Sequence, residues 1–298
     1  MDGRRATCAF VLVVAVAAAT LTCPSVRAGS ESGRKLDDVQ ALVEARQQAV
    51  DAELKQLGPH AWAGEYYEGD GLGSNTTLSL APRSGVAATL RGCLGLYRAN
   101  LGSIESASQG LLRFRFDVPR DAGTLGFPEE LQLVRWGARR YLIAPSSMQD
   151  FVNAMHGGSE PRITAYGRFL LAKGDEGKPV QGLPGLPERY LAAIRSEPLE
   201  AGVLRVERVS AARHGEFCEK RYRITLNRGA LDGLAAGVEL TTRSPDDVYE
   251  RLRVDVADDV TASGELTIHE DECDAPAEVP DRRWVFTTGH YTPIADTP

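Results

Sequence analysis

The sequence predicts a mainly β fold with a few helices (α+β), built from two small antiparallel β-barrel or sandwich domains preceded by an amphipathic helix. Three observations lead to this prediction. Short runs in which apolar and polar residues alternate recur through most of the chain. A cluster of prolines and glycines at 182–187 separates two series of such runs. A stretch near the N-terminus has apolar residues at helical spacing.

An amphipathic helix is predicted from Lys35 to Leu57, and Gly58-Pro59 follows it as a stop signal. Arg46 interrupts the apolar stripe once, so the pattern indicates a single helix and not a sustained coiled coil. We expect the helix to pack on its own domain, and a helix that binds a partner is the alternative. The apolar positions at helical spacing are Leu36, Val39, Val43, Val50, Leu54 and Leu57.

Residues 62–181 have the pattern of an antiparallel meander that curls into a small barrel or a strongly twisted sheet. The clearest strand is Leu112–Val118, in which apolar residues alternate with charged ones. A short helix is expected around Met148–Met155, ended by Gly157-Gly158. Together with the preceding helix, these segments form a predicted domain over residues 35–186.

The best domain boundary is Gly182–Pro187, which contains two prolines and two glycines. A short helix, Glu188–Ser196, follows it. Six short strands come next, in which polar residues alternate with apolar ones, so we expect each strand to bury one apolar face. Six strands in roughly 100 residues match the size of a small sandwich or barrel. The second predicted domain covers residues 187–290.

The N-terminus has the pattern of a secretory signal peptide over residues 1–28. Arg4 and Arg5 precede an apolar run of 12 residues, Cys8–Ala19, and small residues lead to an expected cut after Ala28. The apolar run is shorter than the ~20 residues that span a bilayer as a helix. We therefore expect a periplasmic or secreted protein without a transmembrane segment in the mature chain, with an uncleaved anchor as the alternative.

Three cysteines follow the signal segment: Cys93, Cys218 and Cys273. An odd number in an oxidising compartment indicates one disulfide and one thiol left over. We predict a disulfide between Cys218 and Cys273, because both lie in the C-terminal segment, whereas Cys93 lies in a strand-like run of the other domain. No local signature gives Cys93 the base and orienting partner of a catalytic thiol. We therefore expect Cys93 to be an inert, packed residue.

The most unusual stretch is the glycine-rich segment 69–73, where three glycines in five residues allow positive φ angles. Dinucleotide, Walker and EF-hand patterns all fail here on spacing or residue type. The segment is interpreted as a turn that connects two strands. The alternative is a cation site, for which Glu65, Glu68 and Asp70 are the candidate ligands. No catalytic or cofactor-binding residue is assigned, and no cofactor is expected.

Residues 62–75, continued through Leu78–Pro82 and Gly92–Tyr97, resemble a group of uncharacterised secreted bacterial envelope proteins of proteobacterial type. This resemblance covers residues 60–190 and implies no known activity. The opening Trp62-x-Gly64 is also similar to the start of lipocalin-type barrels.

In the second half, Ile224–Leu240 is similar to the strand, wide turn and strand of small β-barrels in bacterial envelope proteins. Asn227 ends a strand there, and Gly229 and Gly233 allow tight turns. The resemblance implies a fold and a compartment only.

The composition limits the classes of function that are possible. Hydrophobic residues make up 43% and charged residues 25% of the 298 residues, which excludes a disordered chain. The net charge of −7 disfavours nucleic acid as a partner.

Three classes of function remain. The first is an exported, non-catalytic envelope or periplasmic protein that acts by surface interactions with an unknown envelope partner. The second is a binder of a small apolar ligand in the first barrel, and the third is a hydrolase, for which no motif is found. We predict the first class, without enzyme activity. Its expected contact surfaces are the helix Lys35–Leu57 and the turn Gly69–Asn75.

Overall fold

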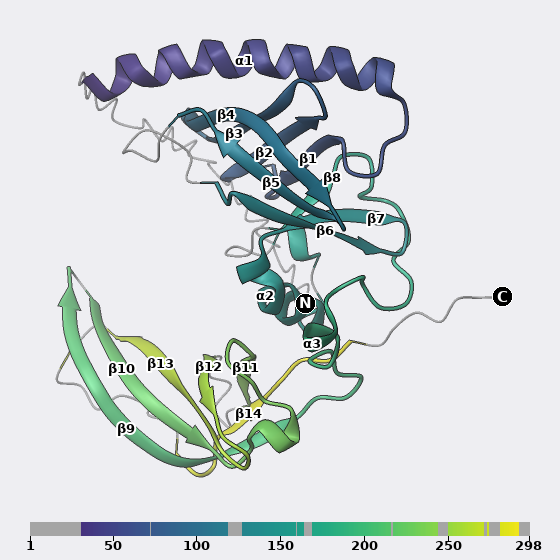
Figure 1. Ribbon diagram of the computed structural model, residues 1–298. Coiled ribbons are helices and arrows are strands. Elements are labelled where there is room, and N and C mark those ends of the chain that lie inside the picture. Colours follow the sequence, from purple (N-terminus) through teal and green to yellow (C-terminus); the bar gives the residue numbers. More distant parts are fainter. Residues whose placement is uncertain are drawn as a thin grey trace, which may run out of the picture.

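The computed structural model describes residues 31–71, 73–118, 127–158, 160–163, 169–215, 217–243, 250–270, 273 and 281–291. Strands in this part of the chain form two closed antiparallel barrels, and a long helix lies across the outside of the first barrel (Figure 1). The predicted fold class, mainly β with a few helices, is therefore correct. The predicted signal segment lies outside the described residues. No described helix is long and apolar enough to cross a membrane.

The first barrel consists of eight strands paired in sequence order, and β1 closes it by pairing with β8. These strands are β1 (Gly64–Glu68), β2 (Asn75–Ala81), β3 (Gly85–Gly92), β4 (Gly95–Ser108), β5 (Leu111–Phe116), β6 (Glu130–Trp136), β7 (Arg139–Ile143) and β8 (Phe169–Ala172). The helices are α1 (Glu31–Leu57), α2 (Met148–His156) and α3 (Glu188–Leu191), with 3-10 turns η1 (Pro145–Ser147), η2 (Pro161–Ile163) and η3 (Ala230–Asp232).

The second barrel has the strand order β10, β13, β12, β11, β14, β9. Its strands are β9 (Glu200–His214), β10 (Phe217–Leu226), β11 (Glu239–Arg243), β12 (Arg251–Ala257), β13 (Ala262–Glu270) and β14 (Val285–Thr287). Since β8 ends at Ala172 and β9 begins at Glu200, the predicted boundary at 182–187 lies in the connection between the barrels.

The interior of the first barrel is filled with side chains. Alternate residues of its strands point inward, and Tyr66 and Leu112 are fully buried there. The Tyr66 hydroxyl donates a hydrogen bond to the carbonyl oxygen of Trp62 at 2.8 Å, which satisfies the polar end of this ring. The barrel is therefore a packed core. Further buried residues of this core are Leu78, Leu80, Val86, Ala88, Phe114, Phe127, Leu131, Leu142, Ala144, Leu170 and Ala172.

Helix α1 covers the outer face of β3 and β4. Val43 packs against Ala87, Ala99 and Leu101, which are outward residues of these strands and are buried by the helix. The expectation that the helix packs on its own domain is confirmed.

Two charged residues of α1 anchor it to the barrel. The Arg46 guanidinium donates from Nη1 to the carbonyl oxygens of Ser84, at 2.9 Å, and Gly102, at 2.8 Å. The Glu53 carboxylate, 5% exposed, accepts hydrogen bonds from the backbone N–H groups of Arg83, at 3.0 Å, and Ser84, at 2.7 Å. Burial raises the pKa of the Glu53 carboxyl, but the hydrogen bonds from Ser84 and Arg83 outweigh burial and hold this pKa below its ordinary value. The residue that interrupts the apolar stripe, Arg46, is thus one of the two anchors.

The docking of α1 also requires a glycine at position 85. Gly85 has a φ of +78°, and a Cβ placed on it would lie 2.3 Å from the Gly102 carbonyl oxygen and 2.8 Å from Arg46 Nη1. Any side chain here would disturb both the β3–β4 pairing and the Arg46 anchor.

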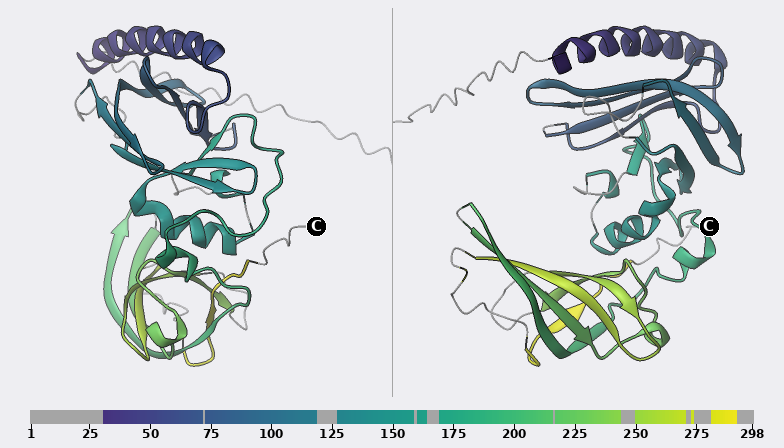
Figure 2. Two further views of the ribbon diagram at one scale, coloured as in Figure 1. Left: turned by 45° about the vertical axis from the view of Figure 1, so that its right-hand side comes forward. Right: turned by 60° about the vertical axis from the view of Figure 1, so that its left-hand side comes forward.

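Helix α2 covers a second outer face of the first barrel, over β6, β7 and β8. Phe151 of α2 meets Tyr141 and Phe169 edge to face, with ring centroids 5.2 Å and 5.3 Å apart, and lies 6.0 Å from Trp136. Figure 2 shows that α2 lies between the two barrels.

The second barrel has its own core around the buried rings of Trp284 and Phe286. Its longest strand, β9, carries two bulges against β10, where Leu204 and Val209 have no partner residue in the ladder. These two side chains are 50% and 52% exposed. Bulges increase the local twist of a strand, which accounts for the curvature of the β9–β10 hairpin in Figure 2.

Polar contacts from α2 connect the two barrels. The Asn153 side chain donates from Nδ2 to the Gly237 carbonyl oxygen at 2.9 Å and accepts at Oδ1 from the Glu239 backbone N–H at 3.2 Å. Asp150 forms an ion pair with Arg253 at 2.8 Å. One helix therefore packs its apolar face on the first barrel and its polar face on the second.

His156 ends α2 at this junction and is only 9% exposed. Its Nε2 accepts a hydrogen bond from the Arg195 backbone N–H at 3.0 Å. Burial, together with the charge of Arg195 and the nearby His290, lowers the pKa of His156 to about 4. The imidazole is therefore neutral in the folded protein at neutral pH.

Replacing Glu53 by alanine is expected to reduce the free energy of unfolding by about 2 kcal/mol, because two partly buried amides lose a charged acceptor. Urea denaturation measures this change. Asp51→Ala is the matched control, since Asp51 is an exposed acid on the same helix. Equal losses in the two variants would contradict the anchor role of Glu53.

Stability is expected to decrease as the pH falls from about 6.5 toward about 4. In this window His156 is protonated in the unfolded chain and neutral in the folded chain. The folded state therefore binds fewer protons than the unfolded state, and acid favours unfolding. Between pH 7 and pH 5 the loss should be about 2 kcal/mol. Urea denaturation at a series of pH values measures it.

The control for this pH dependence uses two substitutions. His156→Gln keeps an oxygen that can accept the Arg195 N–H bond but does not titrate, so this variant should lose the dependence. His214→Gln, at an exposed position of β9, should keep it. An unchanged slope in His156→Gln would show that another group titrates.

Candidate functional site

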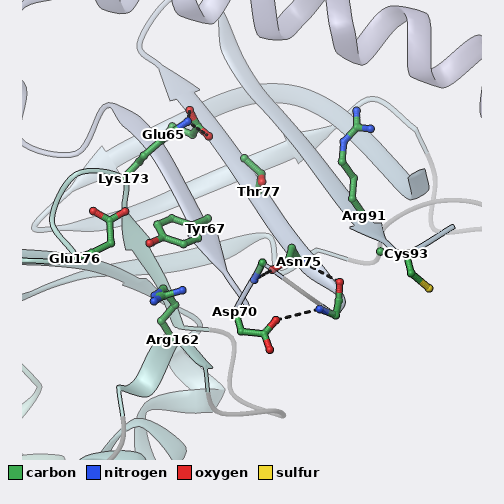
Figure 3. Close-up of a pocket in the computed structure, with 13 residues that line it drawn as sticks. Glu65, Tyr67, Asp70, Asn75, Thr77, Arg91, Cys93, Arg162, Lys173 and Glu176 are labelled. Carbon is green, nitrogen blue, oxygen red and sulfur yellow. Dashed lines mark hydrogen bonds and ion pairs between the residues drawn. The ribbon is translucent and has the colours of Figure 1, made fainter. Parts of the chain in front are cut away.

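A hollow of about 790 Å³ lies on the outer face of the first barrel, beside the turn between β1 and β2 (Figure 3). Because Tyr66 points into the barrel, its neighbours Glu65 and Tyr67 point outward and form one side of the hollow. Thr77 of β2 stands directly opposite Tyr67 in the sheet. The other residues that line the hollow are Asp70, Gly71, Gly73, Asn75, Arg91, Gly92, Cys93, Arg162, Lys173 and Glu176.

The glycine-rich segment folds back on itself as a turn. Asn75 accepts at Oδ1 from the Gly71 N–H at 2.7 Å and donates from Nδ2 to the Gly73 carbonyl oxygen at 2.8 Å. The Asp70 carboxylate accepts from the Gly73 N–H at 3.0 Å. Gly69 has a φ of +106°, and a Cβ there would lie 2.4 Å from Asn75 Oδ1. This geometry agrees with the strand-connecting turn expected from the sequence.

The structure does not bring the three candidate cation ligands together. Glu65 forms an ion pair with Lys173, whose Nζ lies 3.0 Å from both carboxylate oxygens. Asp70 accepts a hydrogen bond from the Gly73 N–H within the turn, and Glu68 is not among the residues that line the hollow. Within the described ranges, no group of three or more acidic, histidine or cysteine residues has the arrangement to hold a metal ion.

Tyr67, Glu176 and Arg162 form a cluster at one side of the hollow. The Arg162 guanidinium stacks over the Tyr67 ring, 4.8 Å from its centroid, and donates to the Gly69 carbonyl oxygen at 2.5 Å. Burial and the hydrogen bond with Glu176 raise the pKa of Tyr67 to about 12. The same hydrogen bond lowers the pKa of Glu176.

These pKa directions bear on catalysis. A general base or nucleophile works best when its pKa lies near the working pH. The pKa of Tyr67 is raised and the pKa of Glu176 is lowered, so both move away from neutral pH. At neutral pH the phenol therefore keeps its proton and the carboxylate stays ionised. The pair is a stable hydrogen bond that positions the Tyr67 ring.

A second hollow, of about 360 Å³, lies between α1 and strands β2 to β4. It is lined by polar residues of α1, among them Gln40, Gln47 and Gln48, and by Thr89 of β3. Thr77 and Arg91 line both hollows, so the two adjoin on one face of the barrel. We call this face the β1–β3 face, defined by Tyr67, Thr77, Thr89 and Arg91.

Sequence reasoning missed the basic residues of this face. Arg91 follows the inward residues Val86, Ala88 and Leu90 in strict alternation, so its outward direction could have been found. Lys173 and Arg162 could not, because their partners Glu65 and Gly69 lie about a hundred positions away in the chain.

The cysteines are arranged partly as predicted. Cys218 and Cys273 form a disulfide with a sequence separation of 55, which confirms that pairing. Cys93 is free, but it is exposed, and the expectation of a packed residue is wrong. Strand β3 ends at Gly92, so Cys93 lies in the turn before β4, where its Sγ is 3.6 Å from the Tyr97 hydroxyl.

The fold and the site together define a mainly β protein of two barrels with an open, polar face on the first. Comparisons of the chain with protein-family models, with curated proteins and with solved structures find no match.

Removal of the disulfide by Cys218→Ala together with Cys273→Ala is expected to reduce the free energy of unfolding by about 4 kcal/mol, because the bond closes a long loop of the unfolded chain. Denaturation of both forms measures this. Cys93→Ala is the control and should change stability little. Detection of a bond from Cys93 to Cys218 or Cys273 in a non-reduced digest would contradict the assignment.

Proposed function

We propose that the protein is exported to the periplasm or beyond and acts as a non-catalytic recognition protein through the β1–β3 face of its first barrel. The observation that carries the proposal is the contrast between inside and outside. The barrel interior is filled with buried side chains, whereas hollows of about 790 Å³ and about 360 Å³ adjoin on its outer surface.

Export is supported by two features. The N-terminal pattern of Arg4, Arg5 and the following apolar run is typical of a secretory signal. The disulfide between Cys218 and Cys273 fits an oxidising compartment.

The two other classes of function have less support. A binder of an apolar ligand needs space within the first barrel, and Tyr66, Leu78 and Leu112 fill that volume. A hydrolase needs a base poised near neutral pH beside a nucleophile. The hydrogen-bonded pair Tyr67 and Glu176 has its pKa values shifted away from neutrality.

Of the two expected contact surfaces, helix α1 and the turn Gly69–Asn75, the helix also forms part of the packing of the barrel. Helix α1 packs its apolar stripe on the barrel, so deletion of the helix would expose Ala87 and Leu101 and damage the fold itself. The turn Gly69–Asn75 borders the β1–β3 face. Point substitutions on this face therefore test recognition better than deletion of the helix.

Thr77→Arg is expected to abolish recovery of partners from an envelope extract, because its side chain would occupy the centre of the face. Quantitative mass spectrometry after affinity capture measures recovery for wild type and variant. Ser106→Arg, at an exposed position of β4 away from both hollows, is the matched control and should recover partners like wild type. Equal recovery by all three proteins would contradict the proposal, as would a hydrolytic activity that disappears in Glu65→Gln.

A further inference from the structure

The β1–β3 face is large enough for a ligand of several residues. Its two hollows meet at Thr77 and Arg91, which Figure 3 shows on neighbouring strands of the sheet. Sites of a few hundred Å³ or more bind molecules with many atoms and are much larger than a single ion requires.

One charged side chain on this face has no partner among the described residues. The Arg91 side chain is exposed and has no hydrogen bond or ion pair with any described residue. The remaining charged residues of the two hollows each have a partner within the protein, as in the pair of Lys173 with Glu65. Those residues are Glu44, Glu65, Asp70, Arg162, Lys173 and Glu176.

Two hydroxyl groups beside Arg91 are free to bind a ligand. Thr77 and Thr89 are paired directly across β2 and β3, so their side chains lie about 5 Å apart on the outer face. Arg91 follows Thr89 by two positions and points to the same side of the sheet. Neither hydroxyl has a hydrogen bond to another described residue. Each can donate to, or accept from, an incoming group.

We propose that the β1–β3 face binds an extended peptide segment that carries one carboxylate, and that this carboxylate pairs with the Arg91 guanidinium. This inference rests on the proposed function and assigns the chemistry of the partner. The planar guanidinium matches a carboxylate with two parallel hydrogen bonds. The Thr77 and Thr89 hydroxyls bind polar groups of the peptide next to that carboxylate.

Several features favour a peptide with a single acidic residue. Glu44, Glu65 and Asp70 border the same hollows, so a run of acidic groups would meet like charges. A sugar ligand commonly stacks one face of its ring on an aromatic side chain, and one face of the Tyr67 ring is already covered by Arg162. A neutral polar segment with one carboxylate avoids both difficulties.

The experiment is a titration of the isotope-labelled full chain, followed by NMR of its backbone amides. The probe is a capped peptide of sequence Ser-Gly-Glu-Gly-Ser, and the comparison peptide has glutamine in place of the glutamate. The glutamate peptide should shift the amide signals of Thr77, Thr89 and Arg91, and the glutamine peptide should bind about tenfold more weakly.

Three variants make the test specific. Arg91→Gln should weaken binding of the glutamate peptide about tenfold and leave the glutamine peptide unaffected. Thr77→Val removes a hydroxyl at nearly constant volume and should weaken both peptides. Arg98→Gln is the matched control, because Arg98 is an exposed arginine of the neighbouring strand that lines neither hollow.

Equal affinity for the two peptides, or unchanged binding by Arg91→Gln, would overturn the inference, and so would the absence of shifts on the β1–β3 face. Tighter binding of glucuronate than of the glutamate peptide would assign the face to an acidic sugar instead. The proposed function is tested separately from this inference. If Thr77→Arg abolishes partner recovery while Arg91→Gln does not, the face is a recognition surface but its ligand is not anchored by a carboxylate.

Discussion

The interior of the first barrel is lined with buried side chains that pack against one another. Each strand sends alternate residues into this space, among them Tyr66, Leu78 and Leu112, and burial of their apolar surface stabilises the barrel. Because the period of a strand is two, filling the inside also decides which residues face outward. The outer faces of the barrel, and every site on them, follow from that constraint.

The outward residues then have three different surroundings. Over β3 and β4 they are small, as in Ala87 and Ala99, and α1 packs closely on them. Over β6 to β8 they are large and aromatic, and α2 covers them. Over β1, β2 and the end of β3 they are polar or charged, as in Thr77 and Arg91, and two hollows remain beside them, one of which is bordered by α1. The β1–β3 face is the sector whose outward residues suit contact with water.

Charged groups position the helices that the apolar residues attract. Glu53 and Arg46 bind backbone groups of the turns at Ser84 and Gly102, which have fixed places in the barrel. A hydrophobic contact alone would let a helix slide or rotate, whereas these directional bonds hold one register. Asn153 does the same between the barrels, since its amide binds two backbone groups of the second barrel. In α1 the need for such an anchor explains why Arg46 interrupts the apolar stripe.

Local pattern was enough to determine the fold class, the end of α1 at Leu57 and the inward side of most strands, because periodicity and stop signals act within a few residues. The predicted start of the helix, Lys35, lies four residues after the observed start at Glu31. The number of cysteines and their distribution along the chain were enough for the disulfide. Strand β4, Gly95–Ser108, was not expected, since α1 covers small residues on its outer side and alternation is lost there. Only the tertiary structure decided which residues meet on the β1–β3 face. Glu65 and Lys173 meet across 108 positions, and barrel closure, which pairs β1 with β8, brings them together. A sequence shows which way a residue points along its own strand, but contacts made by closing a sheet depend on the whole chain.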